Sequence, residues 1–159
     1  MSAAAVLRSL TATLVCGAVS VGLSGCALPA DRELTVFAPA SMPKLGLYSP
    51  AVAVGDLVFL AGIIPFDPVR AALVEPDIEV QTHQVLHNLD QVLAASGLVR
   101  EDIVKVTVFL RSPADMPGMN AVYASYFPRY QPARTTVPGA DWGRDDLLIE
   151  IDVIARRQR

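Results

Sequence analysis

Apolar and polar residues alternate most regularly near the C-terminus, over residues 147–155. Apolar side chains occupy every second position there: Leu147, Ile149, Ile151, Val153 and Ala155. Because successive side chains of a strand point to opposite faces, the pattern predicts a strand with one fully apolar face. The other face holds Leu148, Glu150, Asp152 and Ile154. That face is too apolar to be left in water, so we expect another subunit to cover it.

Shorter apolar runs predict five more strands: 33–37, 51–54, 57–61, 103–110 and 134–139. Gly55 and Asp56 form a turn signal between the second and third runs, which should therefore pair as a hairpin. In the fourth run, alternation places Val104, Val106, Val108 and Leu110 on one face, and Lys105 and Thr107 on the other. Residues 62–68 contain two prolines, which donate no ladder hydrogen bond, and are expected to form a loop.

From Asp77 the apolar spacing changes to threes and fours, which predicts a helix. Its apolar face holds Ile78, Val85, Leu86, Leu89, Val92 and Leu93, and its polar face holds Gln81, Gln84, Asp90 and Gln91. Asp77 can cap the first turn, and Gly97 can adopt the left-handed conformation after the last one. A second helix is predicted over 115–126, with Pro117 in its first turn.

The predicted order is three strands, a helix, a strand, a helix and two strands. This order is typical of an α+β fold in which two helices pack on one face of a mixed sheet. The length of the chain suits a single domain with one core.

The first 25 residues form a nearly unbroken run of small and apolar residues with Arg8 as the only charge. This composition indicates an export signal. Leu23-Ser24-Gly25-Cys26 resembles the lipobox of bacterial lipoproteins. The resemblance implies cleavage before Cys26, acylation of its thiol, a tether over 26–32 and a domain over 33–159, held by lipid on the extracytoplasmic side of the cell envelope. An uncleaved anchor or a chance apolar leader is the alternative.

Charge, cysteine and histidine content argue against several kinds of site. Loss of Arg8 with the leader would change the net charge from −3 to −4, which disfavours nucleic-acid binding. The two cysteines are Cys16 and Cys26, so the domain has no disulfide framework. His83 and His87 are the only histidines, and no further ligands accompany them. We expect neither a metal nor a cofactor.

Arg134 and Glu150 are the candidate functional pair, because each lies inside an otherwise apolar strand. Charged side chains are rarely buried unless they are paired or used. A small anionic substrate would give Arg134 a partner. The alternative is a structural ion pair between Arg134 and Glu150 or Asp152 across a subunit interface.

Several short motifs occur in an order that resembles the Rid family of reactive-intermediate deaminases, also called the YjgF family. They are Gly46-Leu47-Tyr48-Ser49-Pro50, Leu60-Ala61-Gly62, Gln81-Thr82, Asn88-Leu89, Asp102-Ile103-Val104-Lys105, Met119-Asn120-Ala121-Val122-Tyr123, Pro132-Ala133-Arg134 and Ile149-Glu150-Ile151. The resemblance spans residues 43–156, nearly the whole predicted domain.

The resemblance implies a homotrimer of chorismate-mutase-like α+β subunits with clefts between neighbours. These clefts would hydrolyse small 2-imino acids to 2-oxo acids and ammonia. Arg134 would hold the substrate carboxylate, and Glu150 would handle protons or the attacking water. Tyr48, Gly62, Asn120 and Thr136 would line or support the substrate site.

The chain also departs from the family pattern. Leu47 replaces a proline, Ala61 and Ile63 replace a serine and a glutamine, and Thr136 replaces a common cysteine. The site is therefore expected to be more apolar, which could favour bulkier substrates. Two alternatives stay open: a catalytically silent trimer that binds a small carboxylate or serves as a scaffold, and a ribonuclease.

Overall fold

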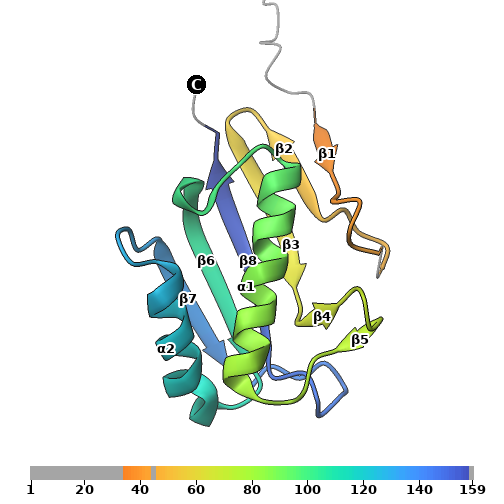
Figure 1. Cartoon of the computed structure of the whole chain (residues 1–159). Coiled ribbons are helices and arrows are strands. Elements are labelled where there is room, and N and C mark those ends of the chain that lie inside the picture. The colour runs from red at the N-terminus through yellow and green to blue at the C-terminus, as the bar shows by residue number, and fades with distance from the viewer. Residues whose placement is uncertain (1–33, 44–45, 158–159) are drawn as a thin grey trace, which may run out of the picture.

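A computed structural model of the protein describes residues 34–43 and 46–157. The predicted leader, tether and Cys26 lie outside the described residues. Two helices, α1 (Ile78–Ala95) and α2 (Met116–Tyr126), cover one face of a six-stranded sheet (Figure 1). The chain thus has the predicted α+β fold. In the described part, no helix is both long and apolar enough to cross a membrane.

The sheet has the order β1-β2-β3-β8-β6-β7. Its strands are β1 (Thr35–Phe37), β2 (Ala51–Val54), β3 (Leu57–Ile63), β8 (Ile149–Arg156), β6 (Ile103–Leu110) and β7 (Ala133–Pro138). β6 and β7 are parallel, whereas the other neighbours are antiparallel. The mixed sheet was predicted, and β8 begins two residues later than expected.

The predicted hairpin is confirmed, since β2 pairs with β3 across the turn at Gly55 and Asp56. β3 runs on to Ile63, with a shift in register between Leu60 and Ile63 where it pairs with β8. The loop predicted over 62–68 is only partly correct. Phe66–Asp67 (β4) and Ala72–Leu73 (β5) form a separate two-stranded ribbon, to which neither proline has to donate a hydrogen bond.

In β6 one predicted position is wrong. Val106, Val108 and Leu110 are buried under the helices, but Val104 is 38% exposed and Ile103 is fully buried in its place. The pairing of β6 with β8 shifts in register between Ile103 and Lys105. A bulge of this kind adds a residue to one strand and breaks strict alternation.

α1 begins and ends as predicted. The Asp77 carboxylate accepts hydrogen bonds from the backbone N–H groups of Glu79 and Val80 at 2.9 and 3.0 Å, and Gly97 has φ +71°. Gln81, however, is fully buried instead of lying on the polar face. Its amide donates to the Asp146 carbonyl at 2.6 Å and its carbonyl accepts from Leu148 N–H at 2.9 Å. Gln81 therefore joins α1 to the start of β8.

The face of the sheet that the two helices do not cover is here called the open face. In β8, Ile149, Ile151, Val153 and Ala155 are buried, while the residues between them turn to the open face, as predicted. Residues that pair directly across neighbouring strands point to the same face. The pairing therefore places apolar side chains of β3, β6 and β7 on the open face, among them Phe59, Phe109 and Val137. Phe59 is 42% exposed and Val137 is 38% exposed. A face of this composition favours burial against another chain.

Candidate functional site

Arg134 projects from β7 on the side of the sheet that carries α2. Its guanidinium carbon lies 4.7 Å from the centre of the Tyr123 ring, and one of its nitrogens lies 4.0 Å from the Met119 sulfur. Both neighbours belong to α2. A guanidinium above an aromatic ring is held by cation–π attraction without being neutralised. Among the described residues no carboxylate forms an ion pair with Arg134, so its charge stays available.

A hollow of about 450 Å³ opens beside this guanidinium. Its walls come from α2 and from the segment that leads into β7: Asn120, Tyr123, Ala124, Phe127, Gln131, Pro132 and Arg134. Asn120 therefore lines the same hollow as Arg134. Thr136 follows two residues later on β7, so alternation turns it to the same side, where it is half-buried.

Tyr123 does more than the core packing that its sequence position suggests. It is 7% exposed and packs against the Phe127 ring at 4.8 Å, but its hydroxyl is buried without a hydrogen-bond partner among the described residues. Burial raises the pKa of this phenol to about 12, although the nearby Arg134 lowers it. The hydroxyl is thus a neutral polar group in the wall of the Arg134 hollow. A residue spaced as a core aromatic gives no sequence signal for this second role.

Glu150 lies on the open face, because its neighbours Ile149 and Ile151 are fully buried on the helix side. It is half-buried on β8, between β3 and β6. Burial raises the pKa of its carboxyl above the ordinary value, a hydrogen bond from the Trp142 side chain lowers it, and the charge of Asp152 raises it again. A carboxyl with a raised pKa can exchange protons closer to neutral pH.

Gly62 makes room for the Glu150 carboxyl group. A Cβ atom added at Gly62 would collide with the Glu150 side chain from its Cγ to its carboxyl oxygen. The family resemblance implied that Gly62 lines or supports the substrate site. In the structure its missing side chain provides the space in which the candidate acid sits.

Tyr48 and Gly62 line a narrower and mostly apolar pocket of about 30 Å³. The rest of its lining comes from Met42, Pro43, Pro50, Ile63, Ile64, Phe66 and Val92. Ile63, which stands where the family pattern has a glutamine, forms part of the apolar wall of this pocket. Tyr48 is 45% exposed at the rim.

The predicted residues thus form two groups that the sheet separates. Arg134, Asn120 and Thr136 lie on the α2 side of β7, whereas Glu150 lies on the opposite face of β8, beside Gly62. β6 lies between the two strands. One chain therefore cannot bring Arg134 and Glu150 to the same small ligand.

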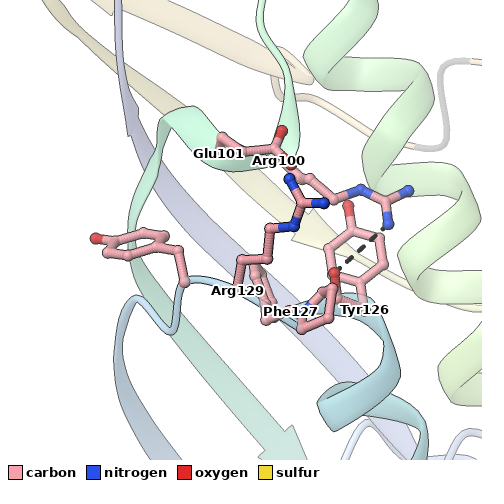
Figure 2. Close-up of a pocket in the computed structure, with 7 residues that line it drawn as sticks. Arg100, Glu101, Tyr126, Phe127 and Arg129 are labelled. Atoms are coloured by element: carbon pink, nitrogen blue, oxygen red, sulfur yellow. Dashed lines mark hydrogen bonds between the residues drawn. The ribbon is translucent and has the colours of Figure 1, made fainter.

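A different hollow, of about 290 Å³, lies near the C-terminus of α2 (Figure 2). It contains none of the predicted residues. Arg100 stacks over the Tyr126 ring at 4.1 Å and pairs with Asp90 at 2.9 Å, and Asp90 accepts a 2.5 Å hydrogen bond from the Tyr126 hydroxyl. Burial and this hydrogen bond raise the pKa of Tyr126. Because the three groups satisfy one another, this network ties α1 to α2.

Metal ligands are not gathered in the described part of the chain: no three residues among His, Cys, Asp and Glu lie close enough together to hold an ion. His83 and His87 are exposed on α1.

The model of the family described as endoribonuclease L-PSP matches residues 39–157. A RutC family protein of Pyrococcus horikoshii is 41% identical over 123 residues, which cover 77% of this chain and 97% of that protein. The chloroplastic Reactive Intermediate Deaminase A of Arabidopsis thaliana is 38% identical, with 86% and 71% covered. The 3-aminoacrylate deaminase RutC of Acinetobacter baylyi is 36% identical, with 71% and 89% covered.

Solved structures show the same fold. YyfA of Yersinia pestis, a protein of the Rid family, is 38% identical with a TM-score of 0.73, and 79% of this chain and all of that chain are covered. TdcF of E. coli, solved with bound serine, is 29% identical with a TM-score of 0.71, with 78% and 99% covered. The chain therefore belongs to the endoribonuclease L-PSP family, which is the family of the Rid, YjgF and RutC proteins.

Proposed function

We propose that the protein hydrolyses small 2-imino acids to 2-oxo acids and ammonia, at sites formed between the subunits of a homotrimer. The observation that carries the proposal is the separation of Arg134 and Glu150 onto opposite faces of one sheet. A second chain whose Glu150 face meets the Arg134 hollow would complete the site. Two of the relatives named above are called deaminases, which supports this reaction class.

Arg134 suits the carboxylate of such a substrate. Its planar guanidinium can donate two parallel hydrogen bonds to a carboxylate, a geometry that lysine cannot reproduce. The Tyr123 ring packs against the guanidinium and does not neutralise its charge. The side chain is therefore oriented before the ligand arrives, which lowers the entropy lost on binding.

Glu150 suits the proton transfers. The imine carbon is already electrophilic, so the reaction needs a proton on nitrogen and a water directed at carbon. Water adds to the carbon and a proton to the nitrogen, which forms a carbinolamine. A further proton then passes from the hydroxyl to the amino group, and the carbon–nitrogen bond breaks to leave the 2-oxo acid and ammonia. A carboxyl whose pKa is raised by burial can give and take these protons, and a well-placed acid or base contributes about 10²-fold or more.

The substrate is expected to be small, with a tolerance for apolar side chains. The pocket around Gly62 and Tyr48 has walls of Ile63, Ile64 and Phe66. Such walls offer a non-polar side chain a favourable place and offer few hydrogen bonds.

An oxidase-coupled assay tests this proposal. An amino acid oxidase generates 2-imino acids in place, and formation of the 2-oxo acid is followed with and without the protein, for small and bulky side chains. We expect conversion faster than the spontaneous rate, lost in Arg134→Ala and retained in Arg70→Ala, which changes an exposed arginine that lines neither the Arg134 hollow nor the pocket at Gly62. A folded protein that accelerates no substrate would favour a silent small-carboxylate-binding or scaffold trimer instead.

A ribonuclease is the less favoured reading, although the family is described by that activity. Phosphate-backbone binding requires clustered basic side chains, and the chain carries more acidic than basic residues. Salt-sensitive cleavage of single-stranded RNA at rates equal to imine hydrolysis would reverse this preference.

We also propose that Cys26 is lipidated after export, which rests on the Leu23-Ser24-Gly25-Cys26 motif. In a bacterial host fed labelled palmitate, the full chain should take up label and partition into detergent. Cys26→Ser should do neither, whereas Cys16→Ser should match the wild type in label per molecule, because Cys16 lies in the part removed. Unlabelled wild-type protein in the aqueous phase would contradict lipidation.

A further inference from the structure

We propose that the Tyr123 hydroxyl is a ligand-binding group of the Arg134 hollow, where it donates a hydrogen bond to the same carboxylate that Arg134 holds. The phenol would thus help to select small anionic acids. The inference rests on the proposed function for the class of ligand, a 2-imino or 2-oxo acid. It does not depend on turnover, because stability and binding test it separately.

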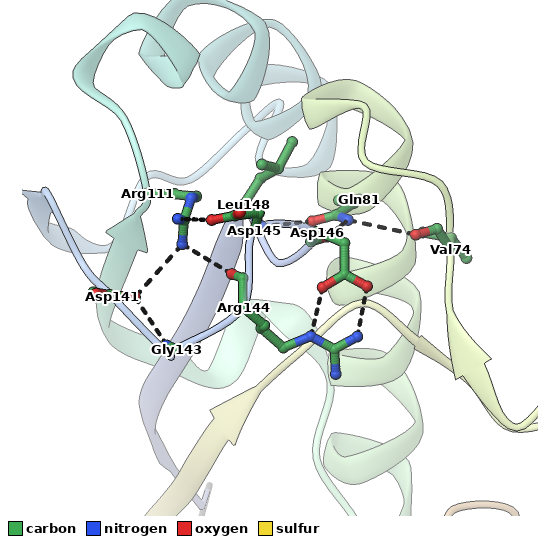
Figure 3. Close-up of polar contacts among 9 residues, drawn as sticks. All are labelled: Val74, Gln81, Arg111, Asp141, Gly143, Arg144, Asp145, Asp146 and Leu148. Atoms are coloured by element: carbon green, nitrogen blue, oxygen red, sulfur yellow. Dashed lines mark hydrogen bonds and ion pairs between the residues drawn. The ribbon is translucent and has the colours of Figure 1, made fainter.

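Other buried polar side chains in the described part of the chain have partners. Gln81 bonds to the Asp146 carbonyl and to the Leu148 N–H (Figure 3). Three more bond to backbone carbonyls at distances between 2.6 and 3.0 Å: Thr82, Asn88 and Ser96. Folded proteins leave few buried polar groups without a partner, because such a group has lost its bonds to water and gained none. Among the residues that the structure describes, the Tyr123 hydroxyl is the exception.

Tyr126, three residues later on α2, shows how a buried phenol of this chain is satisfied. Its hydroxyl donates to the Asp90 carboxylate at 2.5 Å, and the other oxygen of that carboxylate pairs with Arg100 at 2.9 Å. The guanidinium of Arg100 in turn lies over the Tyr126 ring at 4.1 Å. One carboxylate can therefore contact both a tyrosine hydroxyl and the arginine that stacks on the same ring.

Tyr123 and Arg134 reproduce two of these three parts. Both tyrosines are 7% exposed, and the Arg134 guanidinium lies over the Tyr123 ring at 4.7 Å. What Tyr123 lacks, within the described residues, is an acceptor for its hydroxyl. A carboxylate bound to Arg134 would take the place that Asp90 has beside Tyr126. The geometry of one site in this chain thus indicates the ligand of the other.

The hollow and the protonation of the phenol fit this role. Tyr123 and Arg134 line the same hollow of about 450 Å³. Burial raises the pKa of Tyr123 to about 12, although the nearby Arg134 lowers it. The phenol therefore keeps its proton near neutral pH, where the ligand is a carboxylate that can only accept.

The hydroxyl oxygen itself is covered in the chain alone, so a ligand reaches it only when neighbouring side chains shift. Arg134 and Gln131 are exposed, and residues 127–132 between α2 and β7 belong to no helix or strand. Side chains at a binding surface commonly change rotamer when a complex forms. The contact therefore needs movement of surface side chains and no rearrangement of the sheet.

Tyr123→Phe and Tyr126→Phe form a matched pair, because each removes one phenolic oxygen from α2. Tyr123→Phe removes a hydroxyl that has no partner, so it should unfold at the same urea concentration as the wild type or a higher one. Tyr126→Phe breaks a bond to a charged group and should unfold at a lower concentration. If Tyr123→Phe unfolds as early as Tyr126→Phe at the same protein concentration, the hydroxyl has a protein partner and the proposal is wrong.

Calorimetric titration of the full-length protein with 2-oxobutanoate tests the contact. We expect Tyr123→Phe to bind this acid about tenfold or more weakly than the wild type, the loss expected for one hydrogen bond to a charged group. Tyr126→Phe should bind like the wild type, because Tyr126 does not line the Arg134 hollow. Equal affinities of Tyr123→Phe and the wild type, or a wild type that binds no 2-oxo acid, would overturn the proposal.

Turnover shows which part of the ligand the phenol contacts. A bond to the carboxylate is made equally in the ground state and the transition state, so Tyr123→Phe should raise KM and leave kcat little changed. A lower kcat with an unchanged KM would instead place the phenol at the reacting atoms and contradict the assignment to the carboxylate. A wild type that binds 2-oxobutanoate through Tyr123 but hydrolyses no imine would leave this inference standing and refute the deaminase.

Discussion

Mixed assemblies of Arg134→Ala and Glu150→Gln subunits should recover about a quarter of the wild-type activity, although each variant alone is nearly inactive. Each mixed trimer would contain one interface at which an intact Arg134 faces an intact Glu150. Equal amounts of the two variants, refolded together so that subunits assort at random, would be measured in the oxidase-coupled assay. The structure motivates this result, because the sheet keeps the two side chains of one chain apart.

The matched control mixes wild-type subunits with the double variant. A site shared between two chains should leave about a quarter of the activity, whereas a site within one chain should leave about half. Mixtures of the single variants that stay as inactive as their parents, together with one half in the control, would place the site inside a single chain.

Gly62→Ala should reduce activity about as much as Glu150→Gln, by about 10²-fold or more. The new methyl group would occupy the space of the Glu150 carboxyl and push it out of place. The backbone of Gly62 is not in the positive-φ region, so alanine is tolerated there except for this collision. The same collision should lower the free energy of unfolding by about 1–3 kcal/mol, measured in urea at one protein concentration.

A double-mutant cycle isolates the collision. In a Glu150→Ala background the space is empty, so adding Gly62→Ala should change neither stability nor residual activity further. Equal losses of stability in both backgrounds would show that alanine harms the β3 backbone itself, and not through Glu150.

Regular periodicity predicted most of the fold. The caps of α1, the hairpin of β2 and β3 and the two faces of β8 follow from local spacing and turn residues, which act within a few positions of the chain. Val104 was misplaced because a bulge shifts the register, and a bulge carries no periodic signal. Gln81 was placed on the polar face because the sequence does not show that its amide has buried backbone partners 65 and 67 residues away.

The sequence predicted the residues of the candidate site and the face of the sheet that carries Glu150, but not the face that carries Arg134. Arg134 and Glu150 stood out because each is charged within an apolar strand. Their separation depends on strand order, and strands adjacent in the sheet can be far apart in the chain. Tyr123 and Trp142 were missed for a similar reason, since an aromatic residue near a charged partner is recognised only when both positions are known.

A site split across two faces of one sheet would also constrain how the protein can change. Residues of the open face such as Phe59 and Val137 would serve both adhesion between subunits and the alignment of the half-sites. A substitution there would alter assembly and turnover together, even if it touches neither charged group. Evolution of substrate preference in this chain would therefore proceed more freely through the walls of the small pocket, such as Ile64, than through a surface that also has to join subunits.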